Sequence, residues 1–564
     1  MSTGAEVIAQ SLKNLGVEVV FGLVGIPVIE ETTQAKGIKF IGFRNEQAAS
    51  YAASVYGYLT GRPGVLLVVG GPGIIHAMAG IFNSQINCWP LMILGGSVDN
   101  STRYKGGFQE LDQLAVVKQF TKFQARPNGG EDIGRLMTKA YRYAMFGQPG
   151  CSYIDFPGDL IQKKMDHHQD LEEMGEFFQE VPKSLGDPNK LRDVVAAIKT
   201  AKFPLVIIGK GAAYGDASKE LSKFIEKHQL PFIATPMGKG VVSDYCQYNV
   251  SSARSMALKM ADVVLVFGAR LNWILHFGSS RKFSPRVKLI QVNNHAEEIG
   301  ENYQNLGNMG LGLLGDIKKI AKQLLDDTGL QDYKFGPIPE AIVTKIHTNN
   351  RLVALKEDVA SMKNGYLNYH VVYRAMREFL ITRKLQDSTI LVSEGANTMD
   401  ISRVSFPITV AKHRLDAGTN STMGVGLGYC IASKLAKPWC HVLAIEGDSA
   451  FGFSGMEIET AVRYNLPMII VVMNNSGIYH GNVETSADVK KPIELSKDTR
   501  YDLMAESLGA KGYFVNTLAE LDGALNECFG INKVKVNLIN VIIEPGEQKK
   551  VAFNWQQSQQ EAKL

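Results

Sequence analysis

Short runs of Val, Ile and Leu alternate with amphipathic segments along most of this chain. The runs Pro204–Ile208 and Val263–Phe267 are short and almost wholly apolar, as expected of strands that are buried on both faces. Near the N-terminus, Val7, Ile8 and Leu12 recur at helical spacing, which predicts an amphipathic helix. Strands that alternate with helices form parallel sheets with helices packed against them. The pattern therefore predicts an α/β protein with doubly wound parallel sheets.

Two polar stretches interrupt this alternation. Residues 162–190 are dense in Asp, Glu and His, and residues 332–364 are mixed polar with several Gly and Pro. At 564 residues the chain is also too long to fold around a single core. We therefore expect three domains, at 1–165, 190–330 and 365–564.

The most informative motif lies in the third segment, where Asp448 follows the apolar run 441–446 and Asn475 follows the apolar run 468–473. Apolar residues between the two runs recur at helical spacing until Pro467, so the pattern predicts a strand–helix–strand unit. Such a unit places its two strand ends side by side, at the sheet edge where α/β proteins bind ligands.

A carboxylate and an amide oxygen at this edge are the hard ligands that Mg²⁺ prefers, and a helix N-terminus behind Asp448 offers N–H groups to phosphate. A helix-capping Asp and a turn Asn pair are each common alone. The 27-position separation of Asp448 and Asn475, together with the strand–helix–strand context, favours a site for Mg²⁺ and phosphate.

A second candidate carboxylate is Glu46, which follows the apolar run 39–43 and opens a helix rich in alanine. From the residues alone, a Glu in this place is usually a helix N-terminal charge.

The Asp448 motif resembles the diphosphate–Mg²⁺ motif of thiamin-diphosphate enzymes, and Glu46 stands in a context resembling that of the family's catalytic glutamate. The resemblance covers essentially the whole chain and is nearest to the branch of 2-hydroxyacyl-CoA lyases and oxalyl-CoA decarboxylases. The matching runs include Gly25-Ile26-Pro27, Arg44-Asn45-Glu46-Gln47, Gly71-Pro72-Gly73, Gly268-Ala269-Arg270-Leu271-Asn272-Trp273, Glu394-Gly395-Ala396-Asn397-Thr398 and Arg414-Leu415-Asp416. The resemblance implies a pyrimidine-binding first domain, a central domain, and a third domain that binds diphosphate and Mg²⁺.

The resemblance also implies the role of each site residue. Asp448, Asn475 and the backbone carbonyl of Gly477 would bind the metal. Glu46 would bond to N1′ of the cofactor and favour its imino tautomer, with Gln109 and Tyr479 as further catalytic residues. The cofactor would be held by Ala396, Asn397, Thr398, Thr422, Met423, Ser449, Ala450 and Ile478, among which Met423 would wedge beneath the two rings.

Substrate contacts are expected from Ile26, Phe108 and Arg403. An ADP effector, as in some decarboxylases, would bind Lys210, Arg270 and Asp316 of the central domain. Asn293 weakens the ADP prediction, because an acidic residue commonly ends that strand to hold ribose hydroxyls.

Two reactions fit the implied cofactor, whose C2 carbanion adds to an acyl-CoA thioester. A neighbouring 2-hydroxyl leads to release of an aldehyde, and a neighbouring carboxylate leads to release of CO₂. Both routes give formyl-CoA. Phe108-Gln109, where decarboxylases carry Tyr-Glu, and the Lys-rich tail 544–555 favour the lyase, which would act in fatty acid alpha-oxidation.

Leu111-Asp112-Gln113 is shared with decarboxylases, so oxalyl-CoA decarboxylation remains the alternative. A catalytically silent regulatory subunit is a second alternative, although Glu46, Asp448 and Asn475 are all present. His76 stands where the wider family often has Asn, and a lone His is more often structural than a proton shuttle.

Composition and charge argue against some classes of binding partner and location. With 45% hydrophobic and 21% charged residues, a net charge of +4, no basic tract and no bilayer-length apolar run, we expect neither nucleic acid nor a membrane span. The six cysteines lack metal-ligand spacing and indicate reduced thiols. The terminal Ala562-Lys563-Leu564 resembles a signal read by the peroxisomal import receptor, which predicts the peroxisome matrix, with the cytoplasm as a second location. The resemblance implies a homodimer or homotetramer, with the site between the first domain of one subunit and the last domain of another.

Overall fold

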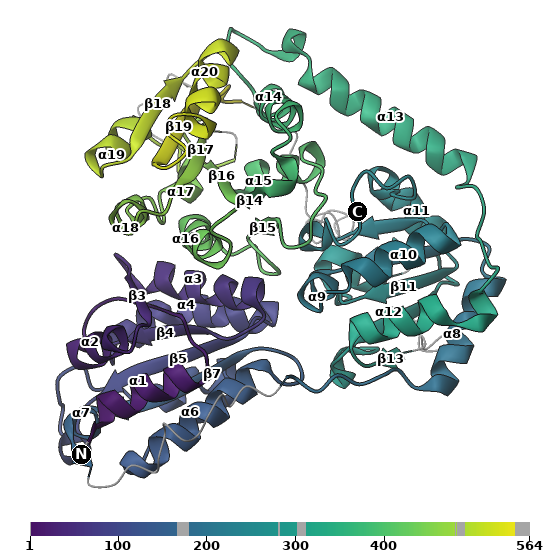
Figure 1. Cartoon of the computed structure of the whole chain (residues 1–564). Helices are drawn as coiled ribbons and strands as arrows, with labels where there is room; N and C mark the ends of the chain where they lie inside the picture. The colour runs from purple at the N-terminus through teal and green to yellow at the C-terminus, as the bar shows by residue number, and fades with distance from the viewer. Residues whose placement is uncertain are drawn as a thin grey trace.

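The computed structural model describes residues 2–165, 180–279, 282–301, 312–479, 481 and 491–546. Three parallel sheets, each packed between helices, form three bodies (Figure 1), which confirms the predicted fold class. Most of the tail 544–555, and all of Ala562-Lys563-Leu564, lie outside the described residues.

The N-terminal sheet has six parallel strands in the order β3-β2-β4-β5-β7-β6. The strands are β2 (Val19–Gly22), β3 (Lys39–Gly42), β4 (Gly64–Val68), β5 (Leu91–Ser97), β6 (Phe123–Ala125) and β7 (Cys151–Pro157). Helices α1 (Gly4–Asn14) and α6 (Gly130–Met145) share one apolar cluster, and α3 (Glu46–Thr60) and α4 (Pro72–Asn87) contribute to another. The predicted N-terminal helix corresponds to α1. Short strands β1 (Ser2–Thr3) and β8 (Lys164–Met165) pair antiparallel, which joins the two ends of this domain.

The C-terminal sheet repeats this topology. Its order is β15-β14-β16-β17-β19-β18, so both sheets place their strands as second, first, third, fourth, sixth and fifth along the domain. The strands are β14 (Thr389–Glu394), β15 (Arg414–Asp416), β16 (His441–Gly447), β17 (Met468–Asn474), β18 (Lys511–Val515) and β19 (Val536–Ile542). Helices α14 (Tyr369–Thr382) and α20 (Leu518–Phe529) belong to one apolar cluster, and α16 (Gly426–Ala436) and α18 (Glu457–Arg463) belong to another.

The helix between β16 and β17 is shorter than the sequence pattern indicated. The chain first forms the one-turn helix α17 (Asp448–Phe451), then turns through Gly452 and Gly455 before α18 begins. Glycine is a poor helix former, and two glycines in four residues explain the interruption.

The central sheet has five parallel strands in the order β10-β9-β11-β12-β13. They are β9 (Pro204–Ile208), β10 (Phe232–Ala234), β11 (Val263–Phe267), β12 (Lys288–Asn293) and β13 (Gly312–Leu314), so β9 and β11 have the predicted bounds. Helices α8 (Pro188–Thr200), α10 (Ser218–His228) and α12 (Ile317–Asp326) cover one face, and α11 (Arg254–Met260) lies on the other.

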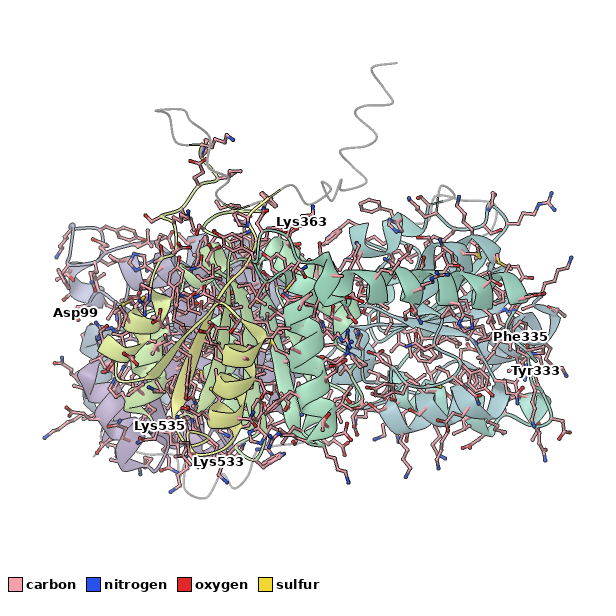
Figure 2. All side chains as sticks on the ribbon, turned by 90° about the horizontal axis from the view of Figure 1, so that it is seen from above. Asp99, Tyr333, Phe335, Lys363, Lys533 and Lys535 are labelled. Atoms are coloured by element: carbon pink, nitrogen blue, oxygen red, sulfur yellow. The ribbon has the colours of Figure 1, made fainter. Side chains whose placement is uncertain are left out.

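The second polar stretch contains a long helix, α13 (Glu340–Glu357), whose only buried residues are Ile342 and Glu357. Before it, Phe335 donates its N–H to the His228 carbonyl at the end of the central domain remote from the C-terminal domain. After it, Lys363 lies beside the C-terminal domain (Figure 2). The polar composition therefore reflects an exposed helix that runs between two domains.

Helix α3 of the N-terminal domain packs directly on α16 of the C-terminal domain (Figure 1). The approach is close because both surfaces are small: a Cβ at Gly428 would lie 2.8 Å from the Ala48 carbonyl oxygen. Ala49, Ala52 and Ala53 are also buried in this region. In the described part of the chain, no helix is long and apolar enough to cross a membrane.

Candidate active site

The predicted cofactor and metal residues lie in the loops and helix starts that follow four neighbouring C-terminal strands. Side chains at these strand ends gather on one edge of the sheet, as expected for a ligand site in a parallel α/β domain. After β14, the first turn of helix α15 (Ala396–Ser405) carries Ala396, Asn397 and Thr398, and the loop after β15 carries Thr422 and Met423. After β16, the one-turn helix α17 carries Asp448, Ser449 and Ala450, and the loop after β17 carries Asn475, Gly477, Ile478 and Tyr479.

Asp448 is buried and joins two of these loops. Its Oδ1 accepts the Ser449 N–H at 2.7 Å, and its Oδ2 accepts the Gly477 N–H at 2.9 Å. Burial raises the pKa of the Asp448 carboxyl to about 6, against the opposing effect of these backbone N–H groups. A cation beside Asp448 would favour its ionised form.

Asn475 lies in the neighbouring loop, where a hydrogen bond fixes the orientation of its side-chain amide. Its Nδ2 donates to the Tyr479 carbonyl oxygen at 3.0 Å, and Asn397 Nδ2 donates to the same oxygen at 3.0 Å. Asn475 Oδ1 is thereby left as an acceptor beside the Asp448–Gly477 pair. Within the described ranges no cluster of three or more His, Cys, Asp or Glu could hold a metal, so a cation here would depend on mixed oxygen ligands.

The surrounding backbone suits a diphosphate. Helix α15 (Ala396–Ser405) begins at this edge after Gly395, whose φ of 100° is a glycine conformation, and its first N–H groups form the positive end of the helix. A Cβ at Gly447 would approach only Thr398 Oγ1, at 3.2 Å, so the backbone before Asp448 faces open space. The residues present therefore fit a metal-bound diphosphate.

The Met423 loop is held by hydrogen bonds from both the C-terminal and the N-terminal domain. Glu394 is fully buried and accepts the N–H groups of Gly424 and Gly426, the latter at 2.6 Å. From the N-terminal domain, the Tyr51 hydroxyl donates to the Met423 carbonyl oxygen at 3.3 Å. The position of Met423 thus depends on contacts from both domains.

Glu46 lies at the N-terminus of α3, where Asn45 caps the helix by accepting the Ala48 N–H at 2.8 Å. Its side chain is only 7% exposed, and its Oε2 lies 3.1 Å from Nδ1 of His76, whose own side chain is 61% exposed. Sequence reasoning treated His76 as a lone histidine, because Glu46 and His76 lie on separate helices 30 positions apart.

Phe108 and Gln109 lie on the loop after β5, at the same sheet edge as Glu46. Phe108 is 88% exposed, and Gln109 adopts a φ of 57°. A Cβ at Gly71 would lie 2.6 Å from the Gln109 carbonyl oxygen, so glycine at 71 permits this approach. Ile26 follows β2 and packs against Gly96 of β5. The predicted catalytic and substrate residues of this domain therefore share one edge.

The Gln113 side chain has a structural role. Its Oε1 accepts the Gly71 N–H at 2.7 Å, and its Nε2 donates to the Gly96 carbonyl oxygen at 3.0 Å and to the Tyr153 hydroxyl at 2.9 Å. These bonds fix the backbone at the ends of β4 and β5. Gln113, the last residue of the run shared with decarboxylases, therefore has a role in the fold.

A cavity of about 1240 Å³ separates the C-terminal cofactor loops from the central domain. Ala396, Met423 and Tyr479 line one side, and Arg403, which pairs with Asp400 at 2.6 Å and with Asp416 at 3.2 Å, also borders it. Glu46 is not among its described lining residues. The central domain contributes Ile207, Ile233, Lys239, Arg254, Trp273, Ile274, Leu275, His276, Phe277 and Lys282.

Sequence reasoning missed this central-domain wall, although Leu271-Asn272-Trp273 carried part of the resemblance. His276 and Phe277 both adopt left-handed φ values, 53° and 56°, a strained conformation that clusters at functional sites. Burial, together with Arg254 and Lys282, lowers the pKa of His276 to about 4, so its ring is neutral at pH 7. Arg254 and Lys282 leave the wall net basic.

The three residues predicted to bind ADP line a second cavity, of about 410 Å³. The Lys210 ammonium bonds to Asn87 Oδ1 and, at 2.8 Å, to Thr419 Oγ1, while Arg270 bonds to the Ile86 carbonyl oxygen. Asp316 caps α12 by accepting the Lys319 N–H. A nucleotide would have to displace the contacts of Lys210 and Arg270 with the other domains.

The strand that leads to Glu46 is held by the C-terminal domain. The Gly42 N–H donates to the Tyr464 hydroxyl at 2.8 Å, and Arg463 Nη2 donates to the Gly42 carbonyl oxygen at 2.7 Å. The Arg44 N–H donates to Oε1 of the fully buried Glu457 at 3.1 Å. Burial raises the pKa of Glu457 to about 7. Helix α18 and the residue that follows it therefore fix the approach to Glu46.

Comparison with known proteins matches all three domains to one family. The thiamine pyrophosphate enzyme N-terminal TPP binding domain matches residues 2–116, the central domain matches 191–324, and the C-terminal TPP binding domain matches 394–541. The chain is similar to the 2-hydroxyacyl-CoA lyase of Saccharomyces cerevisiae, with 47% identity over 98% of this chain and 99% of the relative. Identity is 43% to 2-hydroxyacyl-CoA lyase 1 of Homo sapiens, covering 98% and 96% of the two chains. Oxalyl-CoA decarboxylase of Escherichia coli is 36% identical, covering 97% and 95%.

Proposed function

The chain belongs to the thiamine pyrophosphate enzymes, and we propose that it cleaves a 2-hydroxyacyl-CoA into formyl-CoA and an aldehyde one carbon shorter. The observation that carries this proposal is the graded similarity. Over nearly full length, the chain is more similar to relatives named 2-hydroxyacyl-CoA lyase than to those named oxalyl-CoA decarboxylase. The family's cofactor is thiamin diphosphate with a divalent metal, typically Mg²⁺.

When bound, the cofactor supplies a nucleophilic carbon that adds to the thioester carbonyl and accepts the electron pair of the cleaved carbon–carbon bond. Asp448 and Asn475 would hold the metal, and the N–H groups at the start of α15 would face the diphosphate. Glu46 would hold the proton that the aminopyrimidine ring exchanges. The buried position of Glu46 and its fixed helix cap support this role.

The cavity beside the cofactor loops suits an acyl-CoA. Its central-domain wall combines apolar side chains with Arg254 and Lys282, so one surface offers both packing and cations. A CoA thioester carries phosphates and a long, largely uncharged arm, which these two kinds of side chain would contact. Arg403 is already paired with two aspartates, and it would contact substrate while keeping those partners.

The acyl portion would meet the apolar edge of an N-terminal domain. Exposed Phe108 and Ile75 and half-buried Ile26 lie there, and Gln109 is uncharged. Burial of a fatty chain against such a surface is favourable, whereas the carboxylate of oxalyl-CoA requires hydrogen-bond donors when it leaves water.

We propose that a second copy of the chain completes the site. Phe108 and Tyr104 are exposed at the same sheet edge as Glu46, and Ile478 and Tyr479 are exposed on the loop after β17, so both halves carry apolar surface that a partner would bury. Homodimer and homotetramer both satisfy this requirement.

The resemblance of Ala562-Lys563-Leu564 to an import signal supports the peroxisome matrix as the location, and alpha-oxidation of fatty acids as the setting. ADP binding at the second cavity stays a prediction, and the contacts of Lys210 and Arg270 count against it.

The test is product analysis with a long-chain 2-hydroxyacyl-CoA and with oxalyl-CoA, side by side on the holoenzyme. We expect formyl-CoA and aldehyde in equal amounts from the first substrate, and slow CO₂ release from the second. Faster turnover of oxalyl-CoA than of any 2-hydroxyacyl-CoA would replace this proposal with the decarboxylase.

A further inference from the structure

We propose that His76 is a positioning residue for the reaction: its Nδ1–H holds Oε2 of Glu46 and leaves Oε1 of that carboxyl directed to the cofactor. This inference rests on the proposed function only in taking Glu46 as the group that meets the aminopyrimidine ring. It does not depend on which acyl-CoA is the substrate.

The geometry of the pair is specific. His76 Nδ1 and Glu46 Oε2 are 3.1 Å apart, within the range of an N–H···O hydrogen bond. Among the described residues, Oε2 has this one side-chain partner and Oε1 has none. The charged Arg44 side chain points elsewhere, because it lies 3.7 Å from Glu459 on α18. His76 is therefore the group that orients the Glu46 carboxyl.

Exposure separates His76 from a structural histidine. His228 and His413 are 0% and 6% exposed and pack inside their domains. The His76 side chain, by contrast, is 61% exposed while its partner carboxyl is 7% exposed. A histidine that is so open adds little to packing within its own chain, where its contact with Glu46 is its one described hydrogen bond.

The contact also selects the tautomer of the neutral imidazole. A neutral ring that donates from Nδ1 to a carboxylate has its lone pair on Nε2, because a hydrogen bond at one ring nitrogen selects the tautomer. A carboxyl that is largely withdrawn from water needs such a donor when it is ionised. His76 thus keeps Glu46 in one rotamer with Oε1 available.

Asparagine provides a sharp test, because its Nδ2 can replace the imidazole Nδ1–H in space and donate to the same oxygen. We expect His76→Ala to slow hydrogen–deuterium exchange at C2 of the bound cofactor by about tenfold or more, the effect of losing one good orienting contact. His76→Asn should recover most of that rate. Cofactor affinity, measured by calorimetry, should change less than about threefold in both variants, since the diphosphate and metal contacts lie in the other domain.

A second readout needs neither cofactor nor substrate. In cofactor-free protein, ¹⁵N NMR of the histidine side chains should show His76 as the Nδ1–H tautomer, and Glu46→Ala, which removes the acceptor, should remove that preference.

The matched control for the C2 exchange experiment is His295→Asn. His295 Nδ1 lies 3.0 Å from a carboxylate oxygen of Glu297, in a similar pair that is distant from the site. It should leave C2 exchange unchanged.

Wild-type C2 exchange in His76→Ala would overturn the proposal. So would an Nε2–H tautomer of His76 that is unaffected by Glu46→Ala. Equal loss of exchange in the Ala and Asn variants would also overturn it, since a donor at that place would then not suffice. Failure of the proposed substrate would appear in product analysis alone and would leave the exchange and NMR results in place.

Discussion

Replacing Glu457 by Gln should change how the stability of this protein depends on pH. Glu457 is fully buried between α18 and the turn before Glu46. Its Oε1 accepts the Arg44 N–H at 3.1 Å, and its Oε2 accepts the Thr460 hydroxyl at 2.6 Å. A glutamine can keep both bonds if the Thr460 hydroxyl turns to accept, because one amide atom accepts and the other donates. The substitution therefore removes the charge and preserves the contacts.

The magnitude follows from the pKa of the buried carboxyl. Burial raises this pKa from 4.5 to about 7, so the folded protein binds more protons than the unfolded chain between these two pH values. Stability then falls as pH rises from about 4.5 to about 7, and the loss is complete above about 7. At about 1.4 kcal/mol per pH unit, the full loss is ~3 kcal/mol. The introduced amide does not titrate, so the Glu457→Gln variant should match wild type near pH 5 and exceed it by ~3 kcal/mol at pH 8.

Differential scanning calorimetry of cofactor-free protein at pH 5 and pH 8 measures the effect. For a cooperative unit of about 200 residues, ~3 kcal/mol corresponds to a shift of several degrees in Tm. The control is Glu378→Gln, an exposed residue of the same domain, for which the difference from wild type should stay within about 1 kcal/mol at both pH values. A Glu457→Gln variant that is less stable than wild type at pH 8 would refute the argument, because it would mean that the ionised carboxylate stabilises the turn.

Four further predictions test the site residues and the proposed peroxisomal import signal. Asp448→Ala should abolish binding of thiamin diphosphate with Mg²⁺ in calorimetry, because the loop offers no other carboxylate; cofactor-saturated variant protein would contradict this. Glu46→Gln should bind the cofactor yet lose C2 proton exchange by NMR, and a wild-type exchange rate would remove Glu46 from the mechanism. Changing Phe108-Gln109 to Tyr-Glu should shift the ratio of kcat/KM values toward oxalyl-CoA, with tenfold for each ~1.4 kcal/mol of differential transition-state binding. Deleting Leu564 should abolish import into peroxisomes, and a truncated protein that still enters would place the signal elsewhere.

The parts of this structure that follow from sequence are those encoded locally. Strands β9 and β11 have the predicted bounds because a strand buried on both faces must be a continuous apolar run. The placement of Asp448 and Asn475 at adjacent strand ends was predictable because both residues flank one strand–helix–strand unit. Their role as metal ligands stays a prediction. Helix α13 lies in a stretch that composition marked only as polar, since most of its surface is exposed and leaves a weak apolar signal.

The contacts that could not be predicted join elements far apart in the chain. Arg44 and Glu457 are separated by 413 positions, and nothing in either local pattern indicates that one N–H and one carboxylate will meet. Tyr51 and Met423 are separated by 372 positions. These contacts depend on how α3 packs against the C-terminal domain. The glycines and alanines of that interface permit close packing, but they form no periodic pattern from which the packing could be predicted. The same holds for the cavity wall, which exists only once two domains are placed together.

The two halves of the site share a topology but differ in chemistry, and this difference constrains how substrate binds. The C-terminal edge presents a buried carboxylate, an amide oxygen and helix N–H groups, which suit a cation and phosphate oxygens. The N-terminal edge presents the buried carboxyl of Glu46 and apolar side chains such as Phe108 and Ile26. The loop after β5 also carries Glu110, whose carboxylate accepts the N–H groups of Gly106 and Gly107, so a further anion would meet like charge. We therefore propose that the charged part of an acyl-CoA contacts Arg254 and Lys282, and that its acyl chain contacts Phe108. A substrate whose acyl part carries its own carboxylate conflicts with that division, and this is the physical reason to favour the 2-hydroxyacyl group over the oxalyl group.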